Sequence, residues 1–266
     1  GTFATNTYNN PVHMFQSQNL VNLSNVFNSS YLEFDIVSGL KFKTALGIDF
    51  SYLDQRLYNP LTSLSGSASK GSAASGYVQT RNILATQTLS YDKSFYNDRL
   101  DLNAIAVYEY QKNQRENNRV DASNFPSDLT PYITSAASIT GGTANFTEYA
   151  MASALTRVNL GWEGKYLFSA SIRRDGSSKF PKSGRFGYFP SVSAGWVVSQ
   201  ENFLKGVETI SLLKVRASYG STGNQEGIGN FAYRRTIGGG FNYFDTPGFA
   251  LSAIGSPNLK WESTDQ

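Results

Sequence analysis

The sequence predicts an all-β fold, an antiparallel transmembrane β-barrel of which this chain supplies only a part. Three observations lead to this prediction. Apolar and polar residues alternate over unusually long stretches, short turns alternate with long loops, and no run of about 20 apolar residues could form a membrane-spanning helix. The composition agrees, because only 16% of the 266 residues are charged and 14% are aromatic. Soluble proteins contain about 25% charged residues.

The clearest alternation covers residues 40–52. Its even positions are apolar or hydroxylic: Leu40, Phe42, Thr44, Leu46, Ile48, Phe50 and Tyr52. Its odd positions are polar or small: Lys41, Lys43, Ala45, Gly47, Asp49 and Ser51. A period of two indicates a strand with one apolar and one polar face. At about 3.3 Å per residue this strand spans roughly 40 Å. Strands of soluble proteins average only about five or six residues, so the length favours a strand that crosses a membrane at a tilt.

The same alternation returns in the later strands. Their apolar faces comprise Leu100, Leu102, Ala104, Ala106, Tyr108 and Tyr110; Val158, Leu160 and Trp162; Tyr166, Phe168, Ala170 and Ile172; Tyr188, Pro190, Val192, Ala194, Trp196 and Val198; and Leu213, Val215, Ala217 and Tyr219. Trp162 and Tyr166 flank a short turn at Glu163–Lys165 on the apolar face. This is where the interfacial aromatic residues of a membrane barrel are expected.

The connections between strands also alternate in length. Short turns are predicted at 37–39, 92–98, 163–165 and 200–209, and long loops at 54–76, 112–147, 175–185 and 221–258. Outer-membrane barrels have short turns at the periplasmic rim and long loops outside the cell, so we assign the two rims accordingly. Residues 63–75 are rich in small residues and predict a flexible external loop.

The chain contains about nine predicted strands, the first near Leu20 and the last at Leu259–Gln266. Bacterial single-chain barrels have even strand numbers. We therefore expect residues 1–266 to be a segment of a larger barrel, with terminal strands that pair with strands outside this sequence. Expressed alone, such a segment would aggregate or be degraded.

The residue counts exclude several classes of function. The chain has no cysteine and only one histidine, His13, so disulfide frameworks, thiol catalysis and multi-histidine metal sites are not expected. The net charge of +3 comes from scattered residues and gives no reason to expect a nucleic-acid partner. We expect no enzymatic activity, no cofactor and no metal.

Five motifs in order along the C-terminal part carry a resemblance to a known family. They are Tyr166–Phe180, Phe186–Trp196, Glu201–Leu204, Leu213–Gln225 and Pro257–Glu262. On these motifs the chain resembles the SusC/RagA family of TonB-linked, or TonB-dependent, outer-membrane proteins. Residues 1–150 share only the barrel-like character.

The resemblance implies a barrel of about 22 strands with a plug in its lumen. It also implies import of oligosaccharides or peptides across the outer membrane of a Gram-negative bacterium, with outer-membrane lipid around the barrel, a TonB complex as energy source and a SusD-like surface lipoprotein as partner. Residues 1–266 match the barrel and contain no recognisable plug domain. Two alternatives are a structural or adhesive barrel without transport, and a soluble β-sandwich that binds carbohydrate.

Two groups of residues are candidates for ligand binding. Arg173, Arg174 and Asp175 lie where a strand meets a long external loop and could contact an anionic or hydroxylated ligand, although a turn with locally paired charges is the alternative. Three aromatic residues of a Gly-rich external stretch could stack on sugar rings, pack against a capping protein or simply fill the folded loop: Phe241, Tyr243 and Phe244. The charges on the polar faces could line a substrate path or contact a plug: Lys41, Lys43, Asp49, Asp101, Glu109, Arg157, Lys214 and Arg216.

The alternation at residues 40–52 predicts that Leu46 faces lipid and Ala45 faces the lumen. Leu46→Arg should cost about 2–4 kcal/mol of barrel stability near the bilayer midplane, and Ala45→Arg should cost clearly less. Labelling of single cysteines from the aqueous phase checks the assignment. Labelling at position 46 with protection at position 45 would reverse it.

Overall fold

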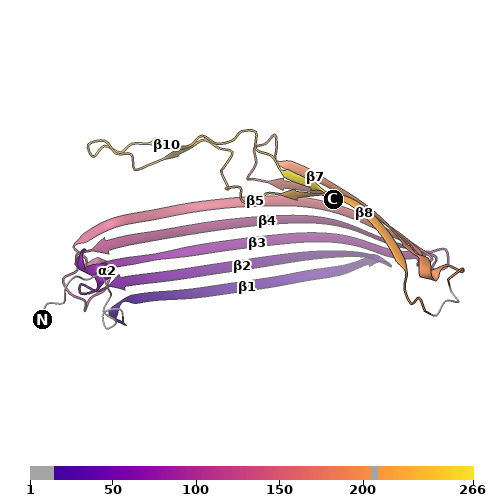
Figure 1. Cartoon of the computed structure of the whole chain (residues 1–266), viewed down its shortest axis with the longest axis horizontal. Coiled ribbons are helices and arrows are strands. Elements are labelled where there is room, and N and C mark those ends of the chain that lie inside the picture. Colours follow the sequence, from indigo (N-terminus) through magenta and orange to yellow (C-terminus); the bar gives the residue numbers. More distant parts are fainter. Residues whose placement is uncertain (1–14, 205–208) are drawn as a thin grey trace. The chain divides into compact units, whose positions relative to one another are not determined.

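The computed structural model describes residues 15–204 and 209–266 and consists mainly of strands (Figure 1). The strands are β1 (Gln18–Val37), β2 (Leu40–Asn59), β3 (Ser72–Phe95), β4 (Leu100–Ser123), β5 (Ser138–Trp162), β6 (Tyr166–Ser177), β7 (Phe186–Val197), β8 (Lys214–Asn224), β9 (Thr236–Gly238), β10 (Ala250–Ala253) and β11 (Glu262–Asp265). Short helices among the described residues include α2 (Leu64–Ser67), η1 (Ile133–Ser135) and η2 (Val198–Gln200). His13 and residues 205–208 of the predicted last turn lie outside the described residues.

One antiparallel sheet of nine strands has the order β1-β2-β3-β4-β5-β6-β7-β8-β11, and β9 and β10 form a small hairpin of their own. The prediction of nine antiparallel strands is confirmed. The sheet does not close within the described residues, where β1 and β11 form its two edges. No helix in the described ranges is long and apolar enough to cross a membrane.

The chain divides into two compact units, which we describe separately. The first unit contains residues up to 28, 48–82 and 113–148, and the second contains residues 29–47, 83–112 and 149–266. The long strands β1 to β5 contribute residues to both units.

Strand pairing in the second unit places the predicted apolar faces on one side of the sheet. Residues directly opposite one another in neighbouring strands share a face. Successive cross-strand rows on this apolar face are Trp162–Tyr166–Trp196–Val215, Leu160–Phe168–Ala194–Ala217 and Val158–Ala170–Val192–Tyr219. The predicted apolar faces of β5 to β8 therefore form one continuous surface.

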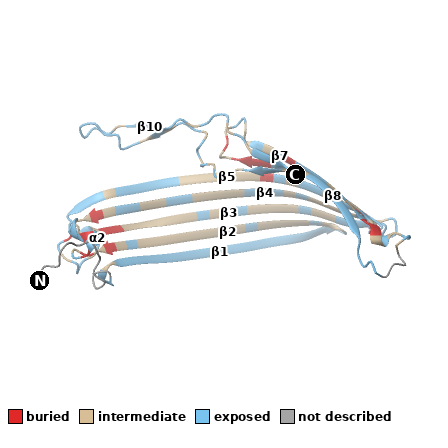
Figure 2. Cartoon of the chain, viewed as in Figure 1, coloured by how far each residue is buried: buried red, intermediate tan, exposed pale blue. Residues whose placement is uncertain are grey.

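This apolar face is not covered by a second layer within the described residues. Phe168 is 45% exposed and Val192 is 43% exposed, although both are large apolar side chains. Buried residues gather instead at strand ends, beside α2 and around β7 (Figure 2). A β-sandwich would bury such a face against a second sheet. The exposed apolar face is the surface expected for a sheet in contact with lipid.

The rim next to the turn at residues 163–165 combines aromatic rings with an ion cluster. Trp162 and Tyr166 are direct cross-strand partners, as predicted. The Glu201 carboxylate accepts hydrogen bonds from the Tyr166 hydroxyl at 2.6 Å and from Trp196 Nε1 at 3.1 Å. Lys165 Nζ lies 3.5 Å from the same carboxylate. The hydrogen bond from Tyr166, followed by that from Trp196, lowers the pKa of Glu201 below its ordinary value of 4.5.

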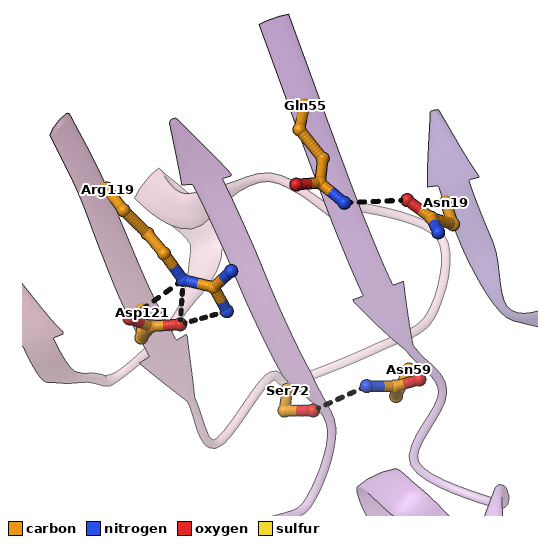
Figure 3. Close-up of polar contacts among 6 residues, drawn as sticks. All are labelled: Asn19, Gln55, Asn59, Ser72, Arg119 and Asp121. Atoms are coloured by element: carbon orange, nitrogen blue, oxygen red, sulfur yellow. Dashed lines mark hydrogen bonds and ion pairs between the residues drawn. The ribbon is translucent and has the colours of Figure 1, made fainter. Parts of the chain in front are cut away.

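In the first unit the strands extend beyond the segments in which apolar and polar residues alternate, and polar side chains pair there. Figure 3 shows three polar pairs: Gln55–Asn19, Asn59–Ser72 and Arg119–Asp121. The first two join neighbouring strands at 3.0 and 3.1 Å, and the third holds a guanidinium 2.8 Å from a carboxylate on one strand. Outside lipid both faces of a strand are wet, so the hydropathy pattern ends while the backbone ladder continues.

The predicted long loops are therefore too long. The connections after β2 and β4 are only residues 60–71 and 124–137. The loops predicted at 175–185 and 221–258 are shortened in the same way, because β6 continues to Ser177, β8 continues to Asn224 and the β9–β10 hairpin occupies part of the second loop.

The two connections of the first unit fold together around a small core. Tyr58, Ala73, Ala122 and Phe125 are buried, and the rings of Tyr58 and Phe125 meet edge to face at 5.2 Å. Asp128 accepts a hydrogen bond from the Tyr58 hydroxyl at 2.7 Å and one from the Leu61 backbone N–H at 2.9 Å. Residues of 60–71 and 124–137 thus belong to one packed body.

The prediction of a flexible loop at 63–75 is wrong. Ser63 caps the short helix α2, because its hydroxyl accepts a hydrogen bond from the Gly66 N–H at 3.0 Å. A side chain at Gly66 would meet the Pro60 carbonyl oxygen at 2.2 Å. The small residues that suggested flexibility therefore permit close packing.

The loop core yields a stability prediction. Phe125 is only 3% exposed, so Phe125→Ala should destabilise the two connections by about 3–5 kcal/mol through the cavity it leaves. Amide hydrogen exchange in 60–71 and 124–137 should become faster. Leu129→Ala is the matched control, because Leu129 lies in the same connection and is 89% exposed. Equal exchange rates in both variants would contradict the proposed core.

The Glu201 cluster predicts a pH dependence with a definite sign. Since the pKa of Glu201 is lowered in the folded protein, its stabilisation is present above the ordinary pKa of 4.5 and is lost as the pH falls through the folded value. The thermal stability of wild type and Glu201→Gln in the intact protein should differ at pH 7, and the difference should shrink as the pH falls below 4.5. A stability difference that stays constant over this range would contradict the role of the carboxylate.

Candidate functional site

The polar face of β5 to β8, opposite the apolar face, surrounds a hollow of about 700 Å³ in the second unit. Two cross-strand rows supply most of its hydroxyl groups: Arg157–Ser171–Ser191–Gly220 and Asn159–Ser169–Ser193–Ser218. The side chains in these rows are short except for that of Arg157. The face therefore leaves space and offers hydroxyl groups that both donate and accept hydrogen bonds.

Arg173 and Asp175 form a paired group at one end of this hollow. Arg173 Nε donates to both carboxylate oxygens of Asp175 at 2.8 Å, and Arg173 Nη2 donates to Ser153 Oγ at 3.1 Å. The Asp175 side chain is 9% exposed and that of Arg173 is 37% exposed. The carboxylate is thus neutralised locally, while part of the guanidinium faces the hollow. Ser153 is 4% exposed and completes the group, although no pattern in the sequence indicated it.

Arg174 lies on the other side of the sheet. Its guanidinium carbon is 3.8 Å from the centre of the Phe186 ring and 5.9 Å from that of Tyr188. The prediction that Arg173, Arg174 and Asp175 form one cluster is therefore wrong. All three belong to β6, in which successive side chains point to opposite faces.

The alternative of a turn at Asp175–Gly176 is also wrong, because both residues continue the ladder and pair with Gly187 and Phe186 of β7. The local pairing of charges in that alternative is confirmed by the contact of Arg173 with Asp175.

The aromatic candidates lie between β9 and β10 and do not line the hollow. The ring centres of Tyr243 and Phe244 are 4.7 Å apart, and Tyr243 exchanges two backbone hydrogen bonds with Thr246 across a tight turn. Tyr243 is 75% and Phe244 is 85% exposed. These two rings therefore do not fill the loop, and they remain available for contact. Phe241 is exposed as well.

A buried aromatic group beside the hollow was not found from the sequence. Phe189 lines the hollow, and its ring meets that of Trp261 edge to face at 5.7 Å. The ring of Phe180 also packs on Trp261, with ring centres 4.9 Å apart, and Trp261 Nε1 donates to the Arg185 carbonyl at 2.9 Å. A side chain at Gly223 would meet the Phe189 ring at 2.1 Å. These aromatic residues lie within three of the family motifs, Tyr166–Phe180, Phe186–Trp196 and Pro257–Glu262, but no local pattern in the sequence indicated that their rings meet.

The predicted polar-face charges differ in their surroundings. Lys41 lies 3.4 Å from Asp35, Asp49 accepts from Asn82 at 3.3 Å, and Asp101 accepts from Ser94 at 2.7 Å. Within the described residues, no carboxylate lies within 4.0 Å of Arg157, Lys214 or Arg216, which are exposed on the second unit. Lys43 lies over the Tyr31 ring at 4.1 Å.

No group of three potential metal ligands occurs in residues 15–204 or 209–266.

One antiparallel sheet with an exposed apolar face, a polar face of hydroxyl groups and an aromatic short-turn rim defines the class: a wall segment of a transmembrane β-barrel. The chain belongs to the TonB-dependent receptor family, since the family described as "TonB dependent receptor-like, beta-barrel" matches residues 1–266. Members of this family are outer-membrane proteins of Gram-negative bacteria, and they are receptors and transporters rather than enzymes.

Relatives in sequence agree with this assignment. The chain is 34% identical over 266 residues to TonB-dependent receptor P39 of Formosa agariphila, a match that covers 97% of this chain and 25% of the relative. It is 33% identical over 243 residues to TonB-dependent receptor P3 of the same organism, covering 89% of this chain and 24% of that protein. The chain thus spans about a quarter of the length of these relatives.

Two further similarities support the SusC/RagA resemblance, which is confirmed. Over 128 residues the chain is 39% identical to TonB-dependent receptor SusC of Bacteroides thetaiotaomicron, covering 46% of this chain and 13% of SusC. The solved structure of the RagAB peptide transporter has the same fold, with a TM-score of 0.88 and 22% identity over 96% of this chain and 28% of that chain. The exposed apolar face and the family together exclude the soluble β-sandwich alternative.

The Arg173–Asp175 pair predicts that removing the negative charge of Asp175 lowers the free energy of unfolding. Asp175→Asn should destabilise the intact barrel by about 1–3 kcal/mol, because Arg173 Nε–H loses a charged acceptor that it contacts through both carboxylate oxygens. The partial exposure of Arg173 keeps this below the cost of breaking a fully buried pair. Denaturant unfolding measures the change, with Asp245→Asn in an exposed turn as control. Equal midpoints for the two variants would contradict the prediction.

Proposed function

We propose that this chain is part of the barrel wall of a TonB-dependent importer that carries oligosaccharides or peptides across the outer membrane. The observation that carries the proposal is the hollow on the polar face of β5 to β8, with its rows of serine hydroxyl groups beside exposed cations. Hydroxyl groups pair equally well with sugar hydroxyls and with peptide amides. The names of two similar proteins agree, one as the receptor SusC and the other as the RagAB peptide transporter.

The partners follow from the same proposal. A SusD-like surface lipoprotein would contact the long-loop rim, and the exposed rings of Tyr243 and Phe244 suit such a contact because aromatic side chains are enriched in interfaces. A TonB complex would act through the plug of the complete transporter. Import of this kind needs positioning of cargo and no covalent chemistry by the wall.

A pair of neighbouring substitutions tests the function. Ser171 lines the hollow, whereas Ala170 lies on the apolar face of the same strand. In a strain without the parent gene, complementation with Ser171→Trp should leave uptake of labelled cargo several-fold below that of wild type, because the large ring fills the hollow. Ala170→Trp should support uptake close to wild type, since lipid accommodates the ring.

Uptake of labelled oligosaccharides and of labelled peptides is measured separately, at equal amounts of protein in the outer membrane. Loss of one activity alone identifies the cargo. If deletion of the parent gene changes uptake of neither cargo, the import proposal fails and the structural or adhesive barrel takes its place.

A further inference from the structure

Arg174 lies at the outer end of the apolar face of β6. It shares a cross-strand row with Ala154 and Tyr188, whereas the aromatic row of Trp162, Tyr166 and Trp196 lies at the short-turn end. Arg174 lies eight residue steps after Tyr166, which corresponds to about 26 Å along the strand. With a strand tilt of about 35–45°, this corresponds to roughly 20 Å across the membrane, close to the apolar band of about 25 Å in outer-membrane barrels.

The side chain of Arg174 points away from the apolar band. Its guanidinium lies closer to Phe186, at 3.8 Å, than to its own row partner Tyr188, at 5.9 Å. Phe186 pairs with Gly176 and is therefore farther from the short-turn rim. An arginine that buries its stem in the apolar region and extends its charge outward is expected at a membrane interface.

Glycine at position 176 makes this arrangement possible. A side chain there would come within 2.4 Å of the Phe186 ring. With glycine, the ring lies across β6 and supports the face of the guanidinium. The position of the charge is thus set by packing from two strands.

The N–H groups along the edge of this guanidinium have no anionic partner in the part of the chain that the structure describes. No carboxylate lies within 4.0 Å of Arg174 among the described residues, whereas the adjacent Arg173 is satisfied by Asp175 and Ser153. Stacking occupies only the face of a guanidinium, so its edge can donate two parallel hydrogen bonds to an oxyanion. At this depth in a membrane, the abundant oxyanions are the phosphates of lipid headgroups.

We propose that Arg174, supported by Phe186 and Tyr188, binds the phosphate of an outer-leaflet lipid. The site lies on the outer surface of the barrel wall, away from the polar hollow, and it does not depend on the proposed import function. It requires only that the apolar face contact lipid.

Native mass spectrometry of the full-length detergent-solubilised protein tests the proposal, with bisphosphorylated lipid A and its dephosphorylated form as probes. Wild type should retain the bisphosphorylated form about ten-fold more, equivalent to ~1.4 kcal/mol. Arg174→Gln should abolish this preference, and Arg174→Lys should keep part of it because the charge remains without the planar fork. Arg157→Gln removes an exposed arginine from the polar face of β5, away from the lipid-facing side, and should retain the two lipid forms in the same ratio as wild type.

Phe186→Leu provides a second variant, because it keeps the charge and removes the supporting ring. It should retain less bisphosphorylated lipid than wild type. Heat-dependent gel mobility confirms that each variant is folded. Retention by Arg174→Gln equal to wild type would overturn the proposal, as would an equal loss in Arg157→Gln. Displacement of the lipid by millimolar inorganic phosphate would assign the site to free phosphate instead.

Discussion

The structure depends on one constraint, which is that the backbone N–H and C=O groups of a strand in lipid must be paired with neighbouring strands. This constraint explains why the ladder from β5 to β8 keeps its register along the membrane-facing rows. A slip by one residue would move a polar row to the apolar side. The single proline of β7, Pro190, follows the same rule. Pro190 pairs with Ile172 of β6. The pairing of β7 with β8 ends one residue away, at Ser191 and Gly220. The N–H that proline lacks therefore interrupts no hydrogen bond to β8.

The fixed register also explains how one segment serves two environments. In β6, Ser171 belongs to a row of hydroxyl groups while Ile172 beside it is 52% exposed on the apolar face. Arg173 and Arg174 continue this division, since the first is held by an acidic partner and the second stacks on an aromatic ring. The chemistry of adjacent residues is therefore decided by their parity in the strand rather than by their closeness in sequence.

The sequence allowed prediction of those features that lipid imposes on it. The apolar face of β5 to β8 near Leu160 was predictable because lipid selects apolar side chains at every second position. The ends of β2 and β4 were not, because no such selection acts where both faces meet water. The contact of Tyr58 with Phe125 joins residues far apart in sequence, and local patterns carry no information about it. For the candidate site, Arg173 and Asp175 were found from their charges and their place near a strand end. Arg174 could be separated from them only once β6 was known to continue to Ser177, because the side chains of a strand alternate between its two faces.

The small core shared by residues 60–71 and 124–137 has a consequence for how this region changes during evolution. Asp128 holds both Tyr58 and the backbone of Leu61, and Phe125 N–H donates to the Lys70 carbonyl at 2.8 Å. An insertion in one connection would alter the packing of the other. We therefore expect the two connections to vary together, because substitutions at the buried positions must compensate one another, whereas exposed positions such as Leu129 carry no such constraint.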